Sequence, residues 1–263
     1  MKILTYIWHD CFIFSTPRLS VIFDYWKDPL AGDGERPLFL SRLPKDRPLY
    51  VLVSHHHKDH FVKEIFFWAQ DFPLIHYIIS KDTARHARHL IKGDSLYKGF
   101  RPEESQITVL KPGDVFTDSL LKVVAFGSTD IGNSYMLETE GMNIFHAGDL
   151  NAWLWKDESS EEEVKEALDC YSEILNTIYD HYPAVDIAMF PVDSRIGTGY
   201  YTGAKMFVDK IDVRRFFPMH FGLGEKDDQT SYMEDANKIE LYANQSRGEY
   251  ICLQAPYSKY GFS

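Results

Sequence analysis

The most informative chemical feature of the sequence is a run of four histidines and one aspartate within six positions. The run lies in the segment Ser54-His55-His56-His57-Lys58-Asp59-His60. Imidazole and carboxylate groups are the ligands that zinc and similar divalent metals prefer in proteins. A protein core would have to satisfy several imidazole nitrogens at once, and a surface loop has no need of so many. The run therefore predicts a metal site.

The spacing within the run predicts how its side chains are divided between metals. Residues 49–53 are continuously hydrophobic, which is typical of a buried strand. At the end of such a strand His55 and His57 project to one side, whereas His56 projects to the other, where we expect it to pack. The pair Asp59-His60 then enters a turn, where the direction changes. The run can therefore offer two ligands to one metal and two to a neighbouring metal.

The run matches the His-x-His-x-Asp-His motif of the metallo-β-lactamase superfamily, and later motifs agree in type and order. Gly148-Asp149 follows a predicted strand, and Pro218-Met219-His220 follows another strand near the C-terminus. The opening, Tyr6-Ile7-Trp8-His9-Asp10 and then Ile22-Phe23-Asp24, resembles the branch that contains the ascorbate-6-phosphate lactonases and the phospholipase-D-like members. The resemblance covers nearly the whole chain.

This resemblance implies an α+β fold, the four-layer αβ/βα sandwich of the superfamily, as a single domain over residues 1–263. It implies one or two Zn²⁺ ions as cofactor, with Mn²⁺ or iron as alternatives. At the first metal the implied ligands are His55, His57 and a bridging Asp149. At the second metal they are Asp59, His60, Asp149 and His220.

One position departs from the superfamily pattern. The family usually places a histidine ligand between the first motif and the Gly-Asp pair, but residues 126–132 contain no histidine. Ser128 takes that position, and Asp130 is the strong ligand type nearest to it. We therefore expect Asp130 or Ser128 to substitute at the first metal, and the second metal to bind more tightly.

The metal site predicts hydrolysis. A divalent metal with an open coordination position lowers the pKa of its bound water from about 15.7 to about 7, so hydroxide is available at neutral pH. The expected substrate is a small anionic ester, lactone, amide or phosphodiester, with Asp59 or Asp149 as the catalytic proton acceptor. Two alternatives stay open: a one-metal binding module without catalysis, and an iron-dependent redox protein on the same scaffold.

Four further residues are candidates for substrate binding or for support of the metal ligands. His9 belongs to the opening segment that the resemblance places near the metals. Arg195 follows a predicted strand and could hold an anionic group, while Tyr200 or Tyr201 could donate to an oxyanion. A purely structural role is an equal alternative for each of them.

The elements that must position these residues are strands early in the chain and alternating strands and helices later. Strands are expected at 2–8, 19–25, 49–53, 74–79, 107–110, 121–126, 134–139, 144–146, 187–190 and 215–218. Helices are expected at 61–70, 82–91, 160–182, 202–211 and 232–244, with Asp82 or Thr83 capping the second of them. Glu140-Gly141 is typical of a hairpin turn. This mixture predicts two sheets with helices packed outside.

The composition limits the partners. The 263 residues include 28 basic and 39 acidic side chains, for a net charge of −11. This charge argues against a general nucleic-acid binder or a polybasic membrane-surface protein. Three widely spaced cysteines (Cys11, Cys170 and Cys252) argue against a disulfide scaffold. We expect a cytoplasmic protein with a small-molecule substrate, no nucleic-acid or membrane partner, and a homo-oligomer as an open alternative.

Overall fold

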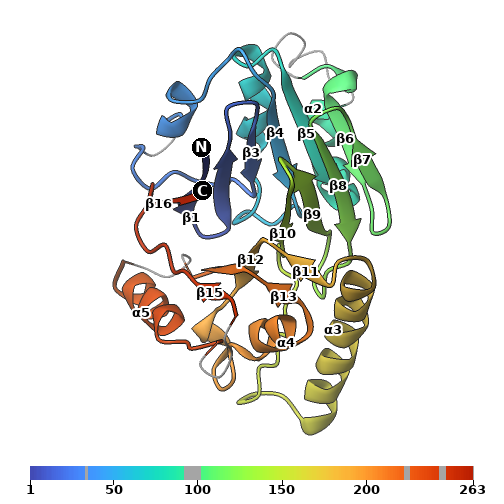
Figure 1. Cartoon of the computed structure of the whole chain (residues 1–263), viewed down its shortest axis with the longest axis vertical. Coiled ribbons are helices and arrows are strands. Elements are labelled where there is room, and N and C mark those ends of the chain that lie inside the picture. Colours follow the sequence, from blue (N-terminus) through green and yellow to red (C-terminus); the bar gives the residue numbers. More distant parts are fainter. Residues whose placement is uncertain (33–34, 92–101, 222–225, 243–246, 263) are drawn as a thin grey trace. The chain divides into compact units, whose positions relative to one another are not determined.

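The computed structural model describes residues 1–32, 35–91, 102–221, 226–242 and 247–262 (Figure 1). The chain divides into two compact units. Unit 1 comprises residues 1–111 and 253–263, and unit 2 comprises residues 112–252. Each unit is built on a seven-stranded sheet.

The sheet of unit 1 has the order β16-β1-β2-β3-β4-β5-β6. Its strands are β1 (Lys2–Trp8), β2 (Cys11–Ser15), β3 (Ser20–Phe23), β4 (Leu49–Val53), β5 (Ile75–Ser80), β6 (Ile107–Leu110) and β16 (Lys259–Phe262). Strands β16, β1, β2 and β3 pair antiparallel, whereas β3, β4, β5 and β6 pair parallel. The buried strand predicted at 49–53 is confirmed, because all five of its residues are buried.

The two helices predicted in unit 1, at 61–70 and 82–91, both differ from the helices in the structure. They are η1 (Leu38–Ser41), η2 (Lys63–Gln70), α1 (Lys81–His86), α2 (Arg88–Ile91) and η4 (Glu104–Gln106). The segment predicted as one helix at 82–91 is interrupted at Ala87, and its predicted cap is wrong. Ser80 caps α1 by accepting a hydrogen bond from the Thr83 N–H, while Asp82 accepts hydrogen bonds from His56 instead.

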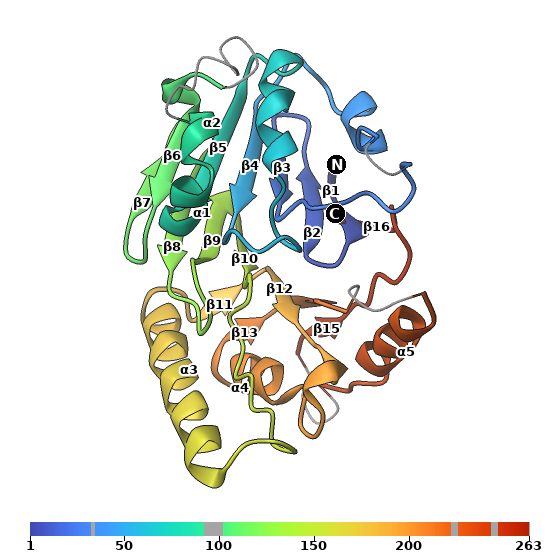
Figure 2. The same ribbon diagram turned by 180° about the vertical axis from the view of Figure 1, so that it is seen from behind.

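The sheet of unit 2 has the order β15-β14-β12-β10-β9-β8-β7 (Figure 2). Its strands are β7 (Val115–Thr117), β8 (Leu121–Phe126), β9 (Ser134–Thr139), β10 (Met142–His146), β12 (Ile187–Pro191), β14 (Arg215–Met219) and β15 (Glu249–Tyr250). A separate small sheet pairs β11 (Ala184–Val185) with β13 (Asp212–Val213). The predicted hairpin turn is confirmed, since Thr139 pairs with Met142 and both Glu140 and Gly141 have positive φ.

The helices of unit 2 are α3 (Glu161–His181), η5 (Ser194–Ile196), α4 (Thr202–Lys210) and α5 (Lys226–Asn237). Helix α3 begins with a capping box between Ser160 and Glu163, as its first residues predict. Its Tyr171 contacts Phe190 of β12, and Phe207 of α4 stacks on Phe145 of β10 with ring centroids 5.0 Å apart. The helix predicted at 232–244 has different bounds: α5 begins at Lys226 and ends at Asn237, residues 238–242 are not helical, and residues 243 and 244 lie outside the described residues.

Strand direction places the candidate site residues at one edge of each sheet. In unit 1, Asp24 follows β3 and the histidine run follows β4, and the carboxyl ends of parallel strands meet at the same edge. The β1–β2 turn reaches that edge too, because β1 and β3 are both antiparallel to β2. In unit 2, Asp149, Asp193 and His220 follow the parallel strands β10, β12 and β14 in the same way.

In the part of the chain that the structure describes, no helix has both the length and the apolar content that a membrane crossing requires. All three cysteines are free thiols, and Cys11 is buried.

Candidate metal centre

The histidine run presents two imidazole nitrogens to one point in unit 1. The Nε2 atom of buried His55 lies 3.0 Å from the Nδ1 atom of exposed His57. On its other side, the His55 Nδ1 atom lies 2.9 Å from the Ser54 hydroxyl. His55 and His57 are therefore brought together as the spacing predicts.

Asp24 is a buried carboxylate that orients two parts of the run. It accepts hydrogen bonds from the Ser54 N–H, from the Ser54 hydroxyl and, at 2.9 Å, from the His60 Nδ1 atom. Its exposed fraction is 1%. Because a carboxylate only accepts, His60 carries a proton on Nδ1, and Nε2 is the nitrogen that could bind a metal. The Ser54 hydroxyl, which donates to Asp24, is left to accept from His55, so His55 is held in the same tautomer.

The Nε2 atom of His60 faces further polar groups of unit 1. It lies 3.2 Å from an oxygen of Asp10 and 3.9 Å from an oxygen of Asp59. The Nε2 atom of His9 lies 3.2 Å from the same Asp10 oxygen and 3.6 Å from the same Asp59 oxygen. The side chains of His9, Asp10 and His60 are fully buried. His9 thus lies beside the predicted ligands Asp59 and His60.

Unit 2 repeats the arrangement of an aspartate behind a histidine. The Nε2 atom of His220 lies 3.1 Å from an oxygen of Asp149, and its Nδ1 atom donates to Asp193 at 2.9 Å. Burial alone would raise the pKa of Asp193, but hydrogen bonds from His220 and Arg195 outweigh burial and hold that pKa well below its usual range. Asp193 therefore stays ionised and accepts from His220 Nδ1, so that Nε2 is the nitrogen that could bind a metal.

The loop after β10 is shaped so that Asp149 lies beside His220. Gly148 has φ +53°, and its N–H donates to the Nδ1 atom of His146. The indole N–H of Trp153 donates to the Asp149 carbonyl at 2.7 Å, and the Trp153 ring packs 5.3 Å from that of His220. His146 is buried and supports this turn, which agrees with the structural role that its position in a strand favours.

The two substitute ligands predicted for the absent histidine lie on one loop of unit 2. A carboxylate oxygen of Asp130 and one of Asp149 lie within 4.8 Å of each other. The Ser128 hydroxyl accepts a hydrogen bond from the Asp130 N–H at 3.3 Å. The spacing of the two carboxylates is compatible with Asp130 as the substitute.

The three predicted substrate residues of unit 2 are engaged in other contacts or exposed. Arg195 donates to both oxygens of Asp193. The Tyr200 hydroxyl donates to the Asp235 carbonyl, and burial raises the pKa of Tyr200. Tyr201 is exposed and packs edge-on against Tyr200. The contacts of Arg195 thus support a positioning role behind His220.

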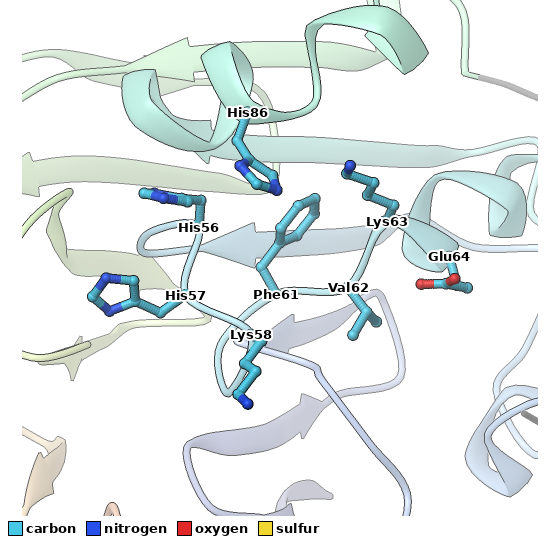
Figure 3. Close-up of a pocket in the computed structure, with 8 residues that line it drawn as sticks. All are labelled: His56, His57, Lys58, Phe61, Val62, Lys63, Glu64 and His86. Carbon is cyan, nitrogen blue, oxygen red and sulfur yellow. The ribbon is translucent and has the colours of Figure 1, made fainter. Parts of the chain in front are cut away.

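A cavity of about 440 Å³ adjoins the histidine run on the side of His56 and His57. Figure 3 shows the rings of His56, His86 and Phe61 gathered at this cavity, with Lys63 extending toward them and Lys58 toward the other side of the loop. The rings of His56 and His86 lie 4.9 Å apart, and Asp82 holds the Nδ1 atom of His56. Burial and the nearby Lys63 ammonium both lower the pKa of His86.

The cavity is lined mainly by basic side chains. Its one acidic lining residue is Glu64. Among the described residues, the ion pairs of unit 1 do not involve Lys58 or Lys63. The cavity therefore offers positive charge beside a predicted metal ligand.

The chain belongs to the β-lactamase superfamily, whose domain model matches residues 3–167. Its fold is the metallo-β-lactamase fold, an α+β fold with two large sheets and helices, as the order of the motifs predicts. A UPF0173 metal-dependent hydrolase of Pyrobaculum islandicum is 22% identical over 247 residues, which cover 89% of this chain and 92% of that protein.

Solved structures are similar over the whole chain. Igni18, a metallo hydrolase of Ignicoccus hospitalis, has a TM-score of 0.59 at 17% identity and matches 100% of this chain and 99% of its own. The metallo-β-lactamase fold protein YhfI of Bacillus subtilis has a TM-score of 0.57 at 10% identity, with 98% of both chains covered. CmlA, a diiron β-hydroxylase of Streptomyces venezuelae, has a TM-score of 0.65 at 12% identity over 99% of this chain and 54% of its own. At these identities the similarities show the fold.

Three carboxylates that the structure places behind or beside histidines had no predicted role, namely Asp10, Asp24 and Asp193. Asp24 lies near the end of the strand predicted at 19–25, and Asp193 comes three residues after the strand predicted at 187–190. A polar residue at the carboxyl end of a parallel strand is the signal that could have found these two. Asp10 gave no such signal, because β2 was not predicted and the turn before it was not recognised.

Proposed function

We propose that the protein is a metal-dependent hydrolase that acts on a small anionic substrate. The observation that carries the proposal is a buried aspartate 2.9 Å from the Nδ1 atom of each of two histidines. Asp24 holds the proton of His60 on Nδ1, and Asp193 does the same for His220, so that each Nε2 atom lies at the candidate site with a lone pair. A carboxylate behind a ligating imidazole raises its basicity and fixes its orientation. The donor set of imidazole and carboxylate fits Zn²⁺, with Mn²⁺ or iron as alternatives.

The ligand sets are proposed as the resemblance to the superfamily implies them, for one or two metals. His55, His57 and Asp149 would hold the first metal, with Asp130 as substitute ligand. Asp59, His60, Asp149 and His220 would hold the second. The order of these residues along the chain and the membership of the superfamily support this assignment.

The ligand count predicts unequal affinities. The first metal lacks one histidine, so titration of zinc into the metal-free protein should give two well-separated affinities. Introducing the absent ligand by Ser128→His should strengthen the weaker site and leave the tighter one unchanged. Two metals bound with equal affinity by the parent protein would contradict the prediction from the number of ligands.

A bound divalent metal supplies a Lewis acid and an activated water at neutral pH. The chain's own residues would then move the proton and hold the substrate. Asp59 and Asp149 are carboxylates that could accept the proton of the attacking water. Because Asp193 and Asp24 hold His220 and His60 from behind, neither imidazole is expected to exchange protons with the substrate.

The cavity beside His57 supports the anionic character of the substrate. His56, His86 and Lys63 converge there, so that a phosphate or carboxylate group would meet hydrogen-bond donors and positive charge. We also propose that the chain belongs to the branch that contains the ascorbate-6-phosphate lactonases, and that it acts in the cytoplasm. Phosphorylated lactones are thus the first compounds to test.

The test is a panel of esters, lactones, amides and phosphodiesters, each with and without an anionic group, assayed with the zinc-loaded protein. Asp149→Ala should abolish turnover of any substrate found, while circular dichroism shows an unchanged fold. Lys63→Gln should raise KM for the anionic members and leave kcat unchanged. The matched control is Lys45→Gln, since Lys45 is an exposed lysine of the same unit paired with Asp71. Equal KM values for both variants would contradict the anion pocket.

Two alternative functions give different results in the same preparation. Stoichiometric iron with a visible absorption band, together with the absence of hydrolysis, would favour a redox protein. One bound metal and no turnover on any compound would favour a binding module. Neither alternative has an observation in its favour beyond the fold shared with CmlA.

A further inference from the structure

We propose that Asp10 is an additional metal ligand beside His60 in unit 1. This inference rests on the proposed function, because it assumes that a divalent metal binds at His60. It assigns to Asp10 a role that neither the histidine run nor the two later motifs would give it.

The first support is the turn in which Asp10 lies. Trp8 of β1 pairs with Cys11 of β2, so His9 and Asp10 form a two-residue hairpin loop. His9 has φ +55° at the first loop position, where glycine is preferred in such turns, and this conformation is unfavourable for a non-glycine residue. Hairpin loops usually lie in solvent, but both side chains here are fully buried. A strained and buried turn of a histidine and an aspartate points to function.

The second support is the spacing of the ligand atoms. The Asp10 oxygen lies 3.2 Å from Nε2 of His60 and 3.2 Å from Nε2 of His9. Two ligands bound to one metal at about 2.0–2.2 Å are separated by roughly 3.0–3.6 Å, depending on the coordination geometry. The Asp10 contacts fall in that range, and the Asp59 oxygen lies 3.6 Å from His9.

The third support is the orientation of the His60 ring. Asp24 lies 2.9 Å behind Nδ1, so Nε2 is the nitrogen of His60 that faces the Asp10 oxygen, at 3.2 Å. A divalent metal bound there would be held by an imidazole nitrogen and a carboxylate oxygen, which are both common metal ligands in proteins.

The additional carboxylate has a consequence for the choice of metal. Carboxylate ligands suit Mn²⁺ better than they suit zinc, whereas imidazole suits zinc and iron. With Asp10 and Asp59 both present, the site gains oxygen ligands and binds Mn²⁺ more strongly than the superfamily pattern alone implies. The ratio of Mn²⁺ to Zn²⁺ affinity is therefore a readout that a merely structural aspartate would not change.

The experiment is a titration of the metal-free full-length protein with Zn²⁺ and separately with Mn²⁺, by calorimetry and elemental analysis. The variants are Asp10→Asn, which keeps the shape, and Asp28→Asn as a matched control. Asp28 is a buried carboxylate of the same unit that accepts from the N–H groups of Leu30 and Leu38 and from the Tyr257 hydroxyl. Thermal unfolding establishes that both variants are folded.

Asp10→Asn should weaken the tighter site by more than about 100-fold, beyond the 10–100-fold range of residues that act through a ligand. The loss should be larger for Mn²⁺ than for Zn²⁺, and Asp28→Asn should change neither affinity. Affinities of Asp10→Asn within about twofold of the parent would overturn the inference and leave a protonated His60 between two aspartates. A parent protein that binds neither metal would instead overturn the proposed function.

Discussion

Asp24 provides the sharpest test of how the fold prepares histidines for a metal. In Asp24→Asn the amide oxygen can still accept from the Ser54 N–H, but the amide nitrogen then faces Ser54 Oγ and His60 Nδ1. The serine hydroxyl can rotate to accept. His60 must move its proton from Nδ1 to Nε2, and this proton blocks the lone pair that a metal needs.

The size of the effect follows from the two roles of Asp24. Loss of a partner behind a metal ligand costs about 10–100-fold in affinity, equivalent to about 1.4–2.7 kcal/mol. Loss of the charge-assisted hydrogen bonds should also lower the free energy of unfolding of the metal-free protein by about 1.5–3 kcal/mol. The two effects separate, because the first appears only when metal is present.

The assay measures zinc affinity by titration of the metal-free protein, and stability by guanidinium unfolding with and without zinc. Asp28→Asn is again the control, since Asp28 also accepts from three donors but orients no histidine. It should lose stability and keep the parent affinity for zinc. A zinc affinity of Asp24→Asn within twofold of the parent, in a folded protein, would refute the reasoning.

Two further predictions concern unit 2. Hydrogen bonds from Lys122 and Tyr182 outweigh the effect of burial and lower the pKa of Glu138. Glu138 therefore contributes stability above its ordinary pKa of 4.5, and this contribution is lost as the pH falls through the lowered value. Glu138→Gln should lower the free energy of unfolding, measured with urea at pH 7, by about 1 kcal/mol, and this loss should become smaller below pH 4.5. The control Glu166→Gln, at an exposed glutamate, should leave the free energy of unfolding unchanged. Gly203→Ala would place a Cβ atom 2.8 Å from the Ala152 backbone nitrogen, so its melting temperature should fall by an amount equivalent to about 1–3 kcal/mol. Gly127→Ala meets its nearest atoms at 3.6 Å and should melt like the parent, and equal melting of both variants would refute the steric argument.

Much of the strand framework could be predicted from the sequence, because strands buried on both faces produce continuous hydrophobic runs. The bounds expected at 49–53, 121–126 and 134–139 are those that the structure has, and nearly all residues of these strands are buried. The helix expected at 61–70 is a 3₁₀ helix over Lys63–Gln70 instead. Its buried residues Ile65, Phe66 and Trp68 lie close together in a short segment. Such a short hydrophobic pattern does not distinguish a 3₁₀ helix with three residues per turn from an α-helix with 3.6 residues per turn.

The histidine run and the two later motifs could be singled out from the sequence as candidate ligands, because several buried imidazole and carboxylate groups are costly unless they bind a metal or one another. The residues behind them were not, since their role depends on partners far away in the sequence. Aspartate is a residue type that often caps helices, but the Asp82 carboxylate accepts a hydrogen bond from His56 instead. Arginine is a residue type that often binds anionic substrates, but the Arg195 guanidinium donates its hydrogen bonds to Asp193. Tertiary contacts of this kind override local patterns.

The most direct test of the central claim is the removal and return of metal during turnover. Once the panel has yielded a substrate, a chelator should abolish hydrolysis as elemental analysis shows the metal leaving. Addition of Zn²⁺ or Mn²⁺ should then restore the rate in proportion to the metal bound per chain. Unchanged turnover by protein from which all metal has been removed would contradict the account.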